Sequence, residues 1–580
     1  MVHPFTHARS LALVAALALG CAHPVGAAEQ ERPLRVVYFV PADRQPIPGY
    51  VERLDRLMRE VQDFYRKGME QRGWGALTFP LERDPNGRLV VHLVNGRLPL
   101  GEYGRDASGA VVGEVGEALR KEGRDPDREV LVVFQVLLDW RNGQAVEVGP
   151  YCGGGSVAGG FALVYDDERL DPRLLGSKEP GAYYGGPCSV GAFNSHYIGG
   201  VAHELGHGFS LPHDCETQAD QVRGHSLMGY GNHTYGEEQR GEGRGTFLSS
   251  VSAMVLAKHP LFTGAGQAVG TAPSCRLEAL EPAFADGKLV LRGRVVAQPA
   301  AYGIAGYNDD LQKAADYDAV GWTSAVAPSG EFRLEIGDLK PGRYELRLRA
   351  CHADGTGTVF PFSYGVDPNG VPDLRALGES ALIAEAMSDL SRGDLDSLRR
   401  VVTRMQSAFT DDAEFQRKAA HLLTLSSPPR PRSPASIPPA EKSVPVSSLE
   451  FREAVVGWGR PLRDQVLPEN QSCFLQVDGR FFERGLYAHA PSTYEVQAGR
   501  QWSTLRAGYG LQDGNDGSVA FVVRGDGREL FRSEVVKDHR LREVKLDISG
   551  VDGLQFVTED GSDGRTSDWG VWLEPTLERY

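Results

Sequence analysis

Three histidines and one glutamate stand close together in the segment 201–214. Its sequence, VAHELGHGFSLPHD, places His203, His207 and His213 in the pattern H-E-x-x-H-x5-H. On a helix the first two lie on one face, about 5–6 Å apart at Cβ, so both rings can reach one zinc ion. Pro212 discourages helix, so the chain can turn back there and bring in the third histidine. Three protein ligands leave a fourth position for water, the arrangement of a catalytic zinc site.

Glu204 supplies the further group that hydrolysis needs at such a site. It follows His203 directly, so its side chain is rotated off the ligand face and can address a water without being a ligand. Zinc lowers the pKa of its water toward about 7, and a carboxylate can take the proton and return it to a leaving amine. With 15 His and 77 Asp plus Glu in 580 residues, chance would produce the pattern roughly 0.001 times per chain. We therefore predict one catalytic Zn2+ ion, in preference to ordinary core or surface histidines.

This segment resembles the signature of the metzincin zinc endopeptidases, H-E-x-x-H-x-x-G-x-x-H followed by a Met-turn. The later segment 226–230, SLMGY, resembles the S-x-M-x-Y turn of the astacin and serralysin branches. Asp214, directly after the third histidine, is more like the adamalysin branch. The resemblance implies that His203, His207 and His213 are the ligands, with Asp214 a structural residue beside them. It also implies that Glu204 is the general base.

The same resemblance assigns two roles in the turn and leaves one departure. Met228 is expected to form the hydrophobic floor beneath the zinc, and Tyr230 to act as a mobile fifth ligand or oxyanion donor. Ser210 stands where the family has glycine, and a positive φ there costs a non-glycine residue roughly 1–2 kcal/mol. Upstream, 159–165 is predicted to be a strand. It is either the sheet edge that pairs with an extended substrate or an internal strand.

Elements that can carry this site are recognisable by their hydrophobic periodicity. The spacing of Tyr50, Leu54, Leu57, Val61 and Tyr65 predicts a helix. Further helices are expected from about residue 195 and over about 247–258. Predicted strands cover 36–40, 89–94, 130–138 and 159–165. This mixture predicts an α+β protease domain of the metzincin type over residues 32–265.

The remaining chain is expected to be multidomain, because 580 residues correspond to about four domains. Short alternating strands over 270–366 predict a β-sandwich of the immunoglobulin or fibronectin kind. Residues 370–425 read as a short helical segment, and 426–447 as a semi-rigid linker rich in Pro and Ser. Residues 448–580 are again strand-like, which predicts a second β-sandwich at the C-terminus.

This last segment resembles the NPCBM family of carbohydrate-binding modules. The residues that carry the resemblance are Gly457-Trp458-Gly459 with Asp464, the run 485–492 (GLYAHAPS), and Asp568-Trp569. The resemblance implies a β-sandwich that binds glycans, with Tyr487, His489 and Trp569 as candidate sugar-binding side chains. The alternative for Trp458 and Trp569 is that they are core residues.

The N-terminus has the order of an export signal. Arg9 precedes the apolar run 11–19, which ends at Gly20-Cys21. A cut before Cys21, in a lipobox-like sequence, would leave a lipidated cysteine, whereas a cut near Ala27 would discard it. Nine apolar residues are too few to span a bilayer. We expect an exported protein of bacterial origin, either secreted or held in the cell envelope as a lipoprotein.

Six cysteines remain after Cys21, and in an exported protein disulfides are expected. Six cysteines allow 15 pairings. We favour Cys275–Cys351 across the sandwich and Cys152–Cys188 before the site helix. The last two are Cys215 and Cys473, either unpaired or with Cys215 taking Cys152 or Cys188.

Charge excludes some partners. Lys plus Arg number 62 against 77 Asp plus Glu, a net charge of −15, which disfavours nucleic acid and anionic lipid. Membrane contact is expected only through a lipid at Cys21.

The predicted function is an exported zinc-dependent endopeptidase acting on proteins or glycoproteins and targeted by a glycan-binding module. The alternatives are a non-catalytic adhesion protein with a vestigial protease domain, which Glu204 argues against, and a glycosidase accessory.

Overall fold

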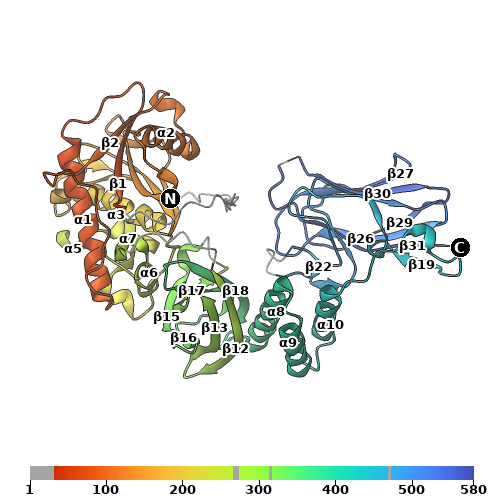
Figure 1. Cartoon of the computed structure of the whole chain (residues 1–580). Helices are drawn as coiled ribbons and strands as arrows, with labels where there is room; N and C mark the ends of the chain where they lie inside the picture. The colour runs from red at the N-terminus through yellow and green to blue at the C-terminus, as the bar shows by residue number, and fades with distance from the viewer. Residues whose placement is uncertain (1–31, 265–272, 313–315, 468–471, 563, 580) are drawn as a thin grey trace.

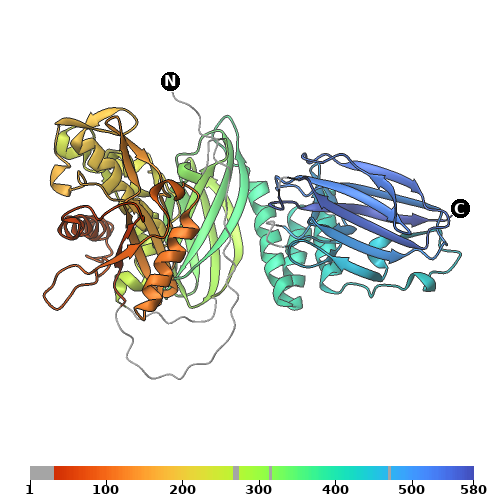
Figure 2. The same ribbon diagram turned by 90° about the horizontal axis from the view of Figure 1, so that it is seen from above.

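The computed structural model of the protein describes residues 32–264, 273–312, 316–467, 472–562 and 564–579. The chain is multidomain, as predicted. Seen from above in Figure 2, an N-terminal α+β domain, a β-sandwich, three helices and a second β-sandwich follow one another in a row. Within these ranges no helix is both long and apolar enough to cross a membrane. The proposed cleavage sites at Cys21 and Ala27 lie outside the described residues.

The N-terminal domain, on the left in Figure 1, is built on a sheet whose strand order is β2-β1-β3-β7-β6. Its first four strands are parallel and β6 is antiparallel. The strands are β1 (Arg35–Val40), β2 (Val91–Asn95), β3 (Val130–Gln135), β6 (Cys152–Ser156) and β7 (Gly159–Tyr165). Strand β7 is therefore internal, which confirms that alternative, and the edge beside it is β6.

Helices cover both faces of this sheet, which is why β1 and β3 are buried along their whole length. Helices α1 (Tyr50–Gln71) and α3 (Val190–Gly208) share a core with Val36 and Tyr38, whereas α2 (Ser108–Lys121) packs with Val37 and Phe39 on the other face. The smaller helices are α4 (Asn232–Thr234), α5 (Glu237–Arg240), α6 (Ser250–Leu256) and α7 (Pro260–Thr263). The smaller strands are β4 (Leu138–Arg141), β5 (Gln144–Glu147), β8 (Pro180–Tyr183), β9 (Pro187–Ser189), β10 (His225–Ser226) and β11 (Thr246–Phe247).

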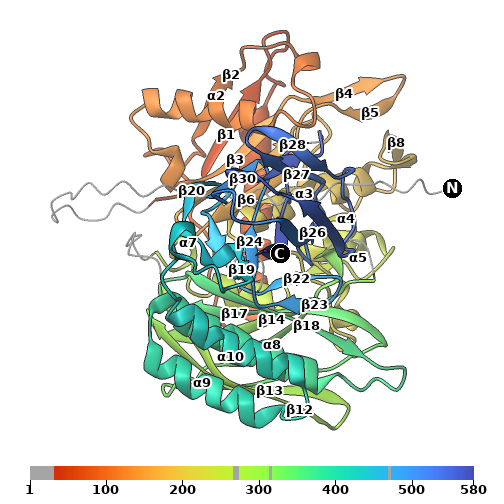
Figure 3. The same cartoon turned by 90° about the vertical axis from the view of Figure 1, so that its right-hand side faces the viewer.

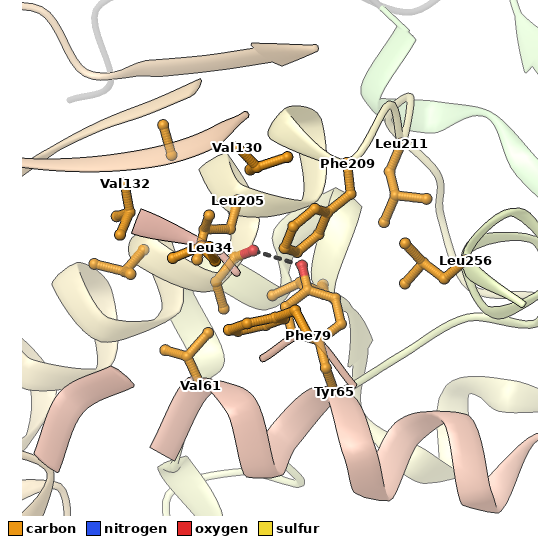
Figure 4. Packing of buried hydrophobic residues seen from close by; sticks show 14 of the residues in the cluster. Leu34, Val61, Tyr65, Phe79, Val130, Val132, Leu205, Phe209, Leu211 and Leu256 are labelled. Carbon is orange, nitrogen blue, oxygen red and sulfur yellow. Dashed lines mark hydrogen bonds between the residues drawn. The ribbon is translucent and has the colours of Figure 1, made fainter. Parts of the chain in front are cut away.

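One tyrosine ties α1 to α3 inside this core. Figure 4 shows Tyr65 surrounded by Phe79, Phe209 and Leu205. Its hydroxyl donates to the carbonyl oxygen of Ala202 at 2.8 Å. Because Ala202 precedes the first predicted zinc ligand, this bond fixes α3 against α1 at the level of the site.

The first sandwich packs two antiparallel sheets, β12-β13-β16 and β15-β14-β17-β18. Its strands are β12 (Ser274–Ala285), β13 (Lys288–Gln298), β14 (Ala301–Asp310), β15 (Val320–Ala325), β16 (Glu331–Ile336), β17 (Gly342–His352) and β18 (Gly357–Val366). Tyr307, Ala319 and Cys351 of the sandwich belong to the same buried cluster as Val251 and Met254 of α6. The N-terminal domain and the sandwich therefore share one hydrophobic core.

Three helices bridge the two sandwiches, and Figure 3 shows them side by side. They are α8 (Leu374–Arg392), α9 (Leu395–Ala408) and α10 (Ala413–Ser426). Leu377 and Ala381 of α8 are buried in the core of the first sandwich. On the other side, Leu398 and Leu422 pack with Phe474 of the C-terminal part.

The C-terminal sandwich has sheets of order β21-β24-β31-β26-β29 and β20-β25-β30-β27-β28, with β19 paired to β31. The first of these sheets contains β21 (Leu462–Arg463), β24 (Gly485–Tyr487), β31 (Gly570–Glu578), β26 (Thr504–Leu511), β29 (Arg542–Asp547) and β19 (Ser443–Pro445). The second contains β20 (Phe451–Val455), β25 (Ser492–Gln497), β30 (Gly553–Asp560), β27 (Val519–Gly525) and β28 (Arg528–Arg532). A separate pair is β22 (Leu475–Val477) with β23 (Arg480–Phe482).

Two predictions about this region and the cysteines need correction. The segment 426–447 is no free linker, because Ile437, Val444 and Val446 are buried in the C-terminal core. The disulfide Cys275–Cys351 is not formed, because Cys351 faces the core shared with the N-terminal domain, whereas Cys275 packs against the core of the sandwich.

The pairing Cys152–Cys188 is also wrong. Cys152 lies on β6 opposite Leu163, and Cys188 lies on β9 opposite Ala182, in separate sheets. All six cysteines of the described residues are free thiols.

Candidate metal centre

Helix α3 carries the first two histidines, and its start is fixed by a cap. The hydroxyl of Ser189 accepts a hydrogen bond from the backbone N–H of Ala192 at 3.1 Å. Most of the helix is buried, because it lies against β6 and β7 on one side and α1 on the other. His203 and His207 follow one another by one turn, as the sequence pattern predicts.

Three imidazole nitrogens converge at the end of this helix. Nε2 of His207 lies 3.2 Å from Nε2 of His203 and 3.0 Å from Nε2 of His213. All three candidate ligand atoms lie within 4.8 Å of one another. The three residues can therefore hold one metal ion, and an all-imidazole donor set suits zinc.

The other ring nitrogens show which tautomer faces this point. Nδ1 of His203 donates to the carbonyl oxygen of Leu227 at 2.8 Å, and Nδ1 of His207 donates to that of Leu211 at 2.9 Å. A carbonyl can only accept, so each neutral ring carries its proton on Nδ1 and presents an unprotonated Nε2 as the candidate ligand atom. Burial and the neighbouring His207 lower the pKa of His203 to about 3, which keeps that ring neutral.

The turn after α3 adopts the conformation that the family's glycine would allow. Ser210 has φ of 69°, so the serine accepts the left-handed region at the expected penalty of roughly 1–2 kcal/mol. Its carbonyl oxygen and its Oγ accept hydrogen bonds from Nη1 and Nη2 of Arg349, at 2.8 and 3.2 Å. Arg349 belongs to β17 of the first sandwich. The departure from the family pattern thus leaves the chain path intact and adds a contact between domains.

Asp214 anchors the chain directly after the third histidine. Its carboxylate is fully buried and accepts hydrogen bonds from the hydroxyls of Ser226, Ser249 (2.8 Å) and Ser252 (2.6 Å). Burial raises the pKa of this carboxyl, and the three hydroxyls oppose that shift. Its backbone N–H donates to the carbonyl oxygen of Met228 at 3.3 Å. Asp214 therefore joins the segment after the helix to the turn Leu227–Gly231, which contains Met228.

Glu204 and Met228 occupy opposite sides of α3. Met228 is fully buried against Gly206, which lies between the two histidines on the helix. Glu204 is buried beneath the edge strand β6, where the backbone N–H of Gly153 donates to its carboxyl group. Burial raises the pKa of Glu204 to about 8, and the hydrogen bond from Gly153 lowers it only in part.

The predicted tyrosine, Tyr230, contacts other histidines, whereas a tyrosine that was not predicted, Tyr317, contacts the three-histidine cluster. Tyr230 is 61% exposed and its ring contacts His225 and His233. Tyr317 comes from the short 3-10 helix Asp316–Asp318 of the first sandwich and stacks on His213, with ring centroids 3.7 Å apart. No motif pointed to Tyr317 or to Arg349, because both come from another domain, more than 100 positions along the chain from the residues that they contact.

A row of aromatic rings includes His196, which lies on α3 seven residues before His203. This aromatic stack comprises Tyr184, His196, His233 and Tyr230. The rings of Tyr184 and His196 are 3.5 Å apart, those of His196 and His233 are 5.1 Å apart, and those of His233 and Tyr230 are 4.8 Å apart. Tyr184, in the hairpin β8–β9, is exposed, as is Tyr230. Burial lowers the pKa of His233 to about 4, so this ring is neutral near pH 7.

The candidate sugar residues of the C-terminal sandwich form a separate cluster. Tyr487, His489 and Trp569 are all buried, and the rings of Tyr487 and Trp569 lie 5.2 Å apart. The core alternative therefore describes Trp569. Trp458 is not a core residue, because it is 48% exposed. Its carbonyl oxygen accepts a hydrogen bond from the hydroxyl of Tyr487 at 3.3 Å.

Comparison with known proteins found a family match for the C-terminal part of the chain and a similarity in fold for a larger part of it. The NPCBM/NEW2 domain family model matches residues 442–578, so this part is an NPCBM domain. No curated protein matches the chain. In fold the chain is similar to OgpA from Akkermansia muciniphila, with 24% identity and a TM-score of 0.51 over 59% of this chain and 96% of that chain.

A second crystal structure of OgpA extends this comparison. It is a catalytically inactive form in complex with an O-glycopeptide substrate, glycodrosocin, and matches with 24% identity and a TM-score of 0.50, over 59% of this chain and 95% of that chain. The matched share is larger than residues 32–264 alone contain. The similarity in fold therefore extends beyond the N-terminal α+β domain.

Proposed function

We propose that this protein is a zinc-dependent endopeptidase that cleaves O-glycosylated polypeptides and is targeted to them by its NPCBM domain. The observation that carries the proposal is the convergence of three Nε2 atoms on one point, with Glu204 on the same helix. The similarity in fold to OgpA, whose inactive form was crystallised with an O-glycopeptide, supports the choice of substrate.

The chain's own residues suit peptide hydrolysis. His203, His207 and His213 would hold the zinc ion, which when bound polarises a carbonyl group and makes water a better nucleophile. Glu204 would take the proton from the attacking water and give it to the leaving amine. Burial raises the pKa of this carboxyl, and the positive charge of a bound zinc ion would act in the opposite direction and favour the carboxylate that serves as the base. Met228 and Asp214 would keep the helix and the following segment in register.

The aromatic stack supports a glycosylated substrate. His196 and His203 are seven residues apart, so on α3 they share one face and lie about 10 Å apart along the axis. Exposed tyrosine rings present both an apolar face and a polar hydroxyl, the combination that a sugar ring with its hydroxyls can use. We assign Tyr184 and Tyr230 to contact with the glycan of the substrate. The predicted role of Tyr230 as a fifth ligand or oxyanion donor is kept as the alternative. We rank it second because the ring contacts His225 and His233, which are not members of the three-histidine cluster.

The N-terminal sequence supports export. A protein that acts on glycoproteins meets them outside the cell, and the order of Arg9, the apolar run 11–19 and Cys21 is that of an export signal. We propose a secreted or envelope-attached protein. Mass spectrometry of the mature N-terminus distinguishes a lipidated Cys21 from a cut near Ala27.

Cleavage of a matched pair of peptides tests the activity. One peptide carries an O-linked glycan at a single Ser or Thr and the other has the same sequence without sugar. The wild type should cleave the glycopeptide faster, and Glu204→Gln should lower kcat/KM at least about 100-fold while its zinc content stays the same. Glu168→Gln, at an exposed carboxylate, is the matched control and should behave as wild type.

The outcomes separate this proposal from the adhesion alternative. If wild type and Glu204→Gln leave both peptides intact although each binds one zinc ion, the protein is a glycan-binding protein with a vestigial site. Equal cleavage of the two peptides by the wild type contradicts the glycopeptide assignment but not the peptidase.

A further inference from the structure

The segment that carries the third histidine is held from the first sandwich as well as from its own domain. The side chain of Arg349 binds Ser210, which lies three residues before His213. The ring of Tyr317 stacks on His213 itself. The backbone N–H of Cys215, two residues after the histidine, donates to the carbonyl oxygen of Ala319 at 2.7 Å. These contacts are spread over the whole segment 210–215.

Arg349 is placed for a two-point contact. Its guanidinium is buried, and two of its nitrogens reach the carbonyl oxygen and the hydroxyl of the same serine. The planar fork of arginine suits two acceptors held side by side, which a lysine ammonium cannot match. Because Ser210 holds the left-handed turn that sends the chain back toward the metal, this contact fixes the direction in which His213 is presented.

Tyr317 acts on the imidazole ring. Its plane lies 25° from that of His213 at a centroid distance of 3.7 Å, and it is nearly parallel, at 7°, to the ring of His203 at 6.4 Å. The tyrosine is nevertheless 47% exposed, so it is not a core residue. An aromatic ring stacked on an imidazole restricts rotation of that imidazole while leaving its edge nitrogens accessible.

The sandwich is also packed closely against helix α6 of the N-terminal domain. Gly321 lies so close to Val251 of α6 that a β-carbon on the glycine would be 3.1 Å from Cγ1 of the valine. The hydroxyl of Tyr302 donates to the carbonyl oxygen of Met254, also in α6. Close packing of this kind transmits a displacement of one domain to the other. The position of the third histidine is thereby coupled to the docking of the second domain.

We infer that Arg349 and Tyr317 are positioning residues for His213, so that the first sandwich is part of the metal centre rather than a separate binding module. This inference rests on the proposed function in that it takes the three histidines to be metal ligands. Its measure is affinity for zinc, which needs no substrate and no turnover. Residues that orient metal ligands from outside the coordination sphere typically change metal affinity 10- to 100-fold when they are replaced.

Zinc affinity of the full-length metal-free protein, measured by competition with a chromogenic chelator, tests Arg349. Arg349→Met should weaken zinc binding about 10-fold or more, and Arg349→Lys should recover part of the loss because one hydrogen bond to Ser210 can still form. Arg347→Met is the matched control, because Arg347 lies two residues away on β17 and faces Asp309 and Glu345. It should leave the affinity unchanged.

Tyr317 supplies a test that does not depend on a buried side chain. Tyr317→Phe keeps the ring and should keep the affinity, whereas Tyr317→Ala should lower it several-fold. The visible absorption of the Co2+-substituted protein should change for Tyr317→Ala and Arg349→Met and not for Tyr317→Phe or Arg347→Met, because ligand geometry sets those bands.

The results separate the two proposals. If Tyr317→Ala and Arg349→Met are folded and bind zinc and cobalt as the wild type does, the inference is wrong, whatever the peptidase assays show. If the wild type itself binds no zinc at the three histidines, the proposed function fails first. Zinc binding that depends on Tyr317 in a protein without peptidase activity would leave the inference standing.

Discussion

The side chain of Met228 fills the space beside Gly206. A β-carbon on Gly206 would collide with Sδ of Met228 and would lie 3.1 Å from its Cε. Gly206 stands between His203 and His207 on α3, and the residue before Met228 supplies the carbonyl oxygen that accepts from His203. The turn that contains Met228 and helix α3 are thus in tight contact at the level of His203 and His207, and the fit depends on a residue without a side chain.

Gly206→Ala is therefore expected to disturb the metal centre although alanine favours helix. Overpacking of a core typically costs about 1–3 kcal/mol, which outweighs the gain of about 1 kcal/mol in helix propensity. Urea unfolding should show the loss, and zinc affinity should fall with it. Gly206→Ala combined with Met228→Ala should recover part of the zinc affinity, because the shorter side chain leaves room for the methyl group. A single variant as stable as the wild type would contradict this packing argument.

Ser210 gives a matched pair of substitutions at a strained position. Ser210→Ala keeps the positive φ and removes the hydroxyl that accepts from Arg349, so it should destabilise the protein by about 1 kcal/mol. Ser210→Gly also removes that hydrogen bond, but it relieves a strain of roughly 1–2 kcal/mol while adding flexibility to the unfolded chain. Its unfolding free energy should lie within about 1 kcal/mol of the wild type. If the glycine variant is the less stable of the two, the turn is not strained.

The sequence predicted that the three histidines would cluster, because their spacing along the chain fixes most of the geometry. His203 and His207 must share a face if the segment is helical, and Pro212 marks the turn that brings in His213. The fold classes of the four parts followed equally directly from hydrophobic periodicity. The positive φ that the family's glycine permits is adopted by Ser210, although the substitution itself left open whether the turn would be kept.

What could not be predicted depends on contacts between distant segments. Arg349 and Tyr317 reach the site only because the sandwich shares a core with α6, and no local pattern encodes that docking. The predicted disulfide between Cys275 and Cys351 was wrong for the same reason. The two cysteines lie at opposite ends of one domain in the sequence, but their side chains pack against different cores. The segment 426–447 was predicted to be a linker because Pro and Ser dominate its composition. A few apolar side chains in it nevertheless pack against the C-terminal domain.

Asp171 makes the stability of the N-terminal domain sensitive to acid. Burial disfavours its charged form, but hydrogen bonds from Arg173 and Arg56 outweigh that effect and hold the pKa of this carboxyl well below its usual range. A depressed folded pKa contributes stability that is present above the unfolded value of about 3.9 and is lost as the pH falls below it. Asp171→Asn should therefore lower the unfolding free energy by about 1.5–3 kcal/mol at pH 7.

The pH dependence of that difference is the check. Urea unfolding of wild type and Asp171→Asn between pH 7 and pH 3 should give a constant gap down to about pH 4 and a shrinking gap below it. Glu168→Gln, at a neighbouring exposed carboxylate, should have the same unfolding free energy as the wild type at pH 7 and at pH 3. A gap that grows as the pH falls would reverse the sign and contradict the assignment.

The two tryptophans of the NPCBM domain should respond in opposite ways to truncation. Trp458 is about half exposed, whereas Trp569 is buried against Tyr487. Trp458→Ala should weaken retention on an immobilised O-glycosylated mucin with little change in stability, because exposed aromatic rings are available to stack on sugars. Trp569→Ala should lower the unfolding free energy by about 3–5 kcal/mol through the cavity that it leaves.

Retention measured at equal concentrations of folded protein separates the two effects. Cleavage of a short peptide is the internal control, because the domain is remote from the metal centre. If Trp458→Ala is retained as strongly as the wild type, the glycan is bound elsewhere on the domain, and the exposed tryptophan has no part in it.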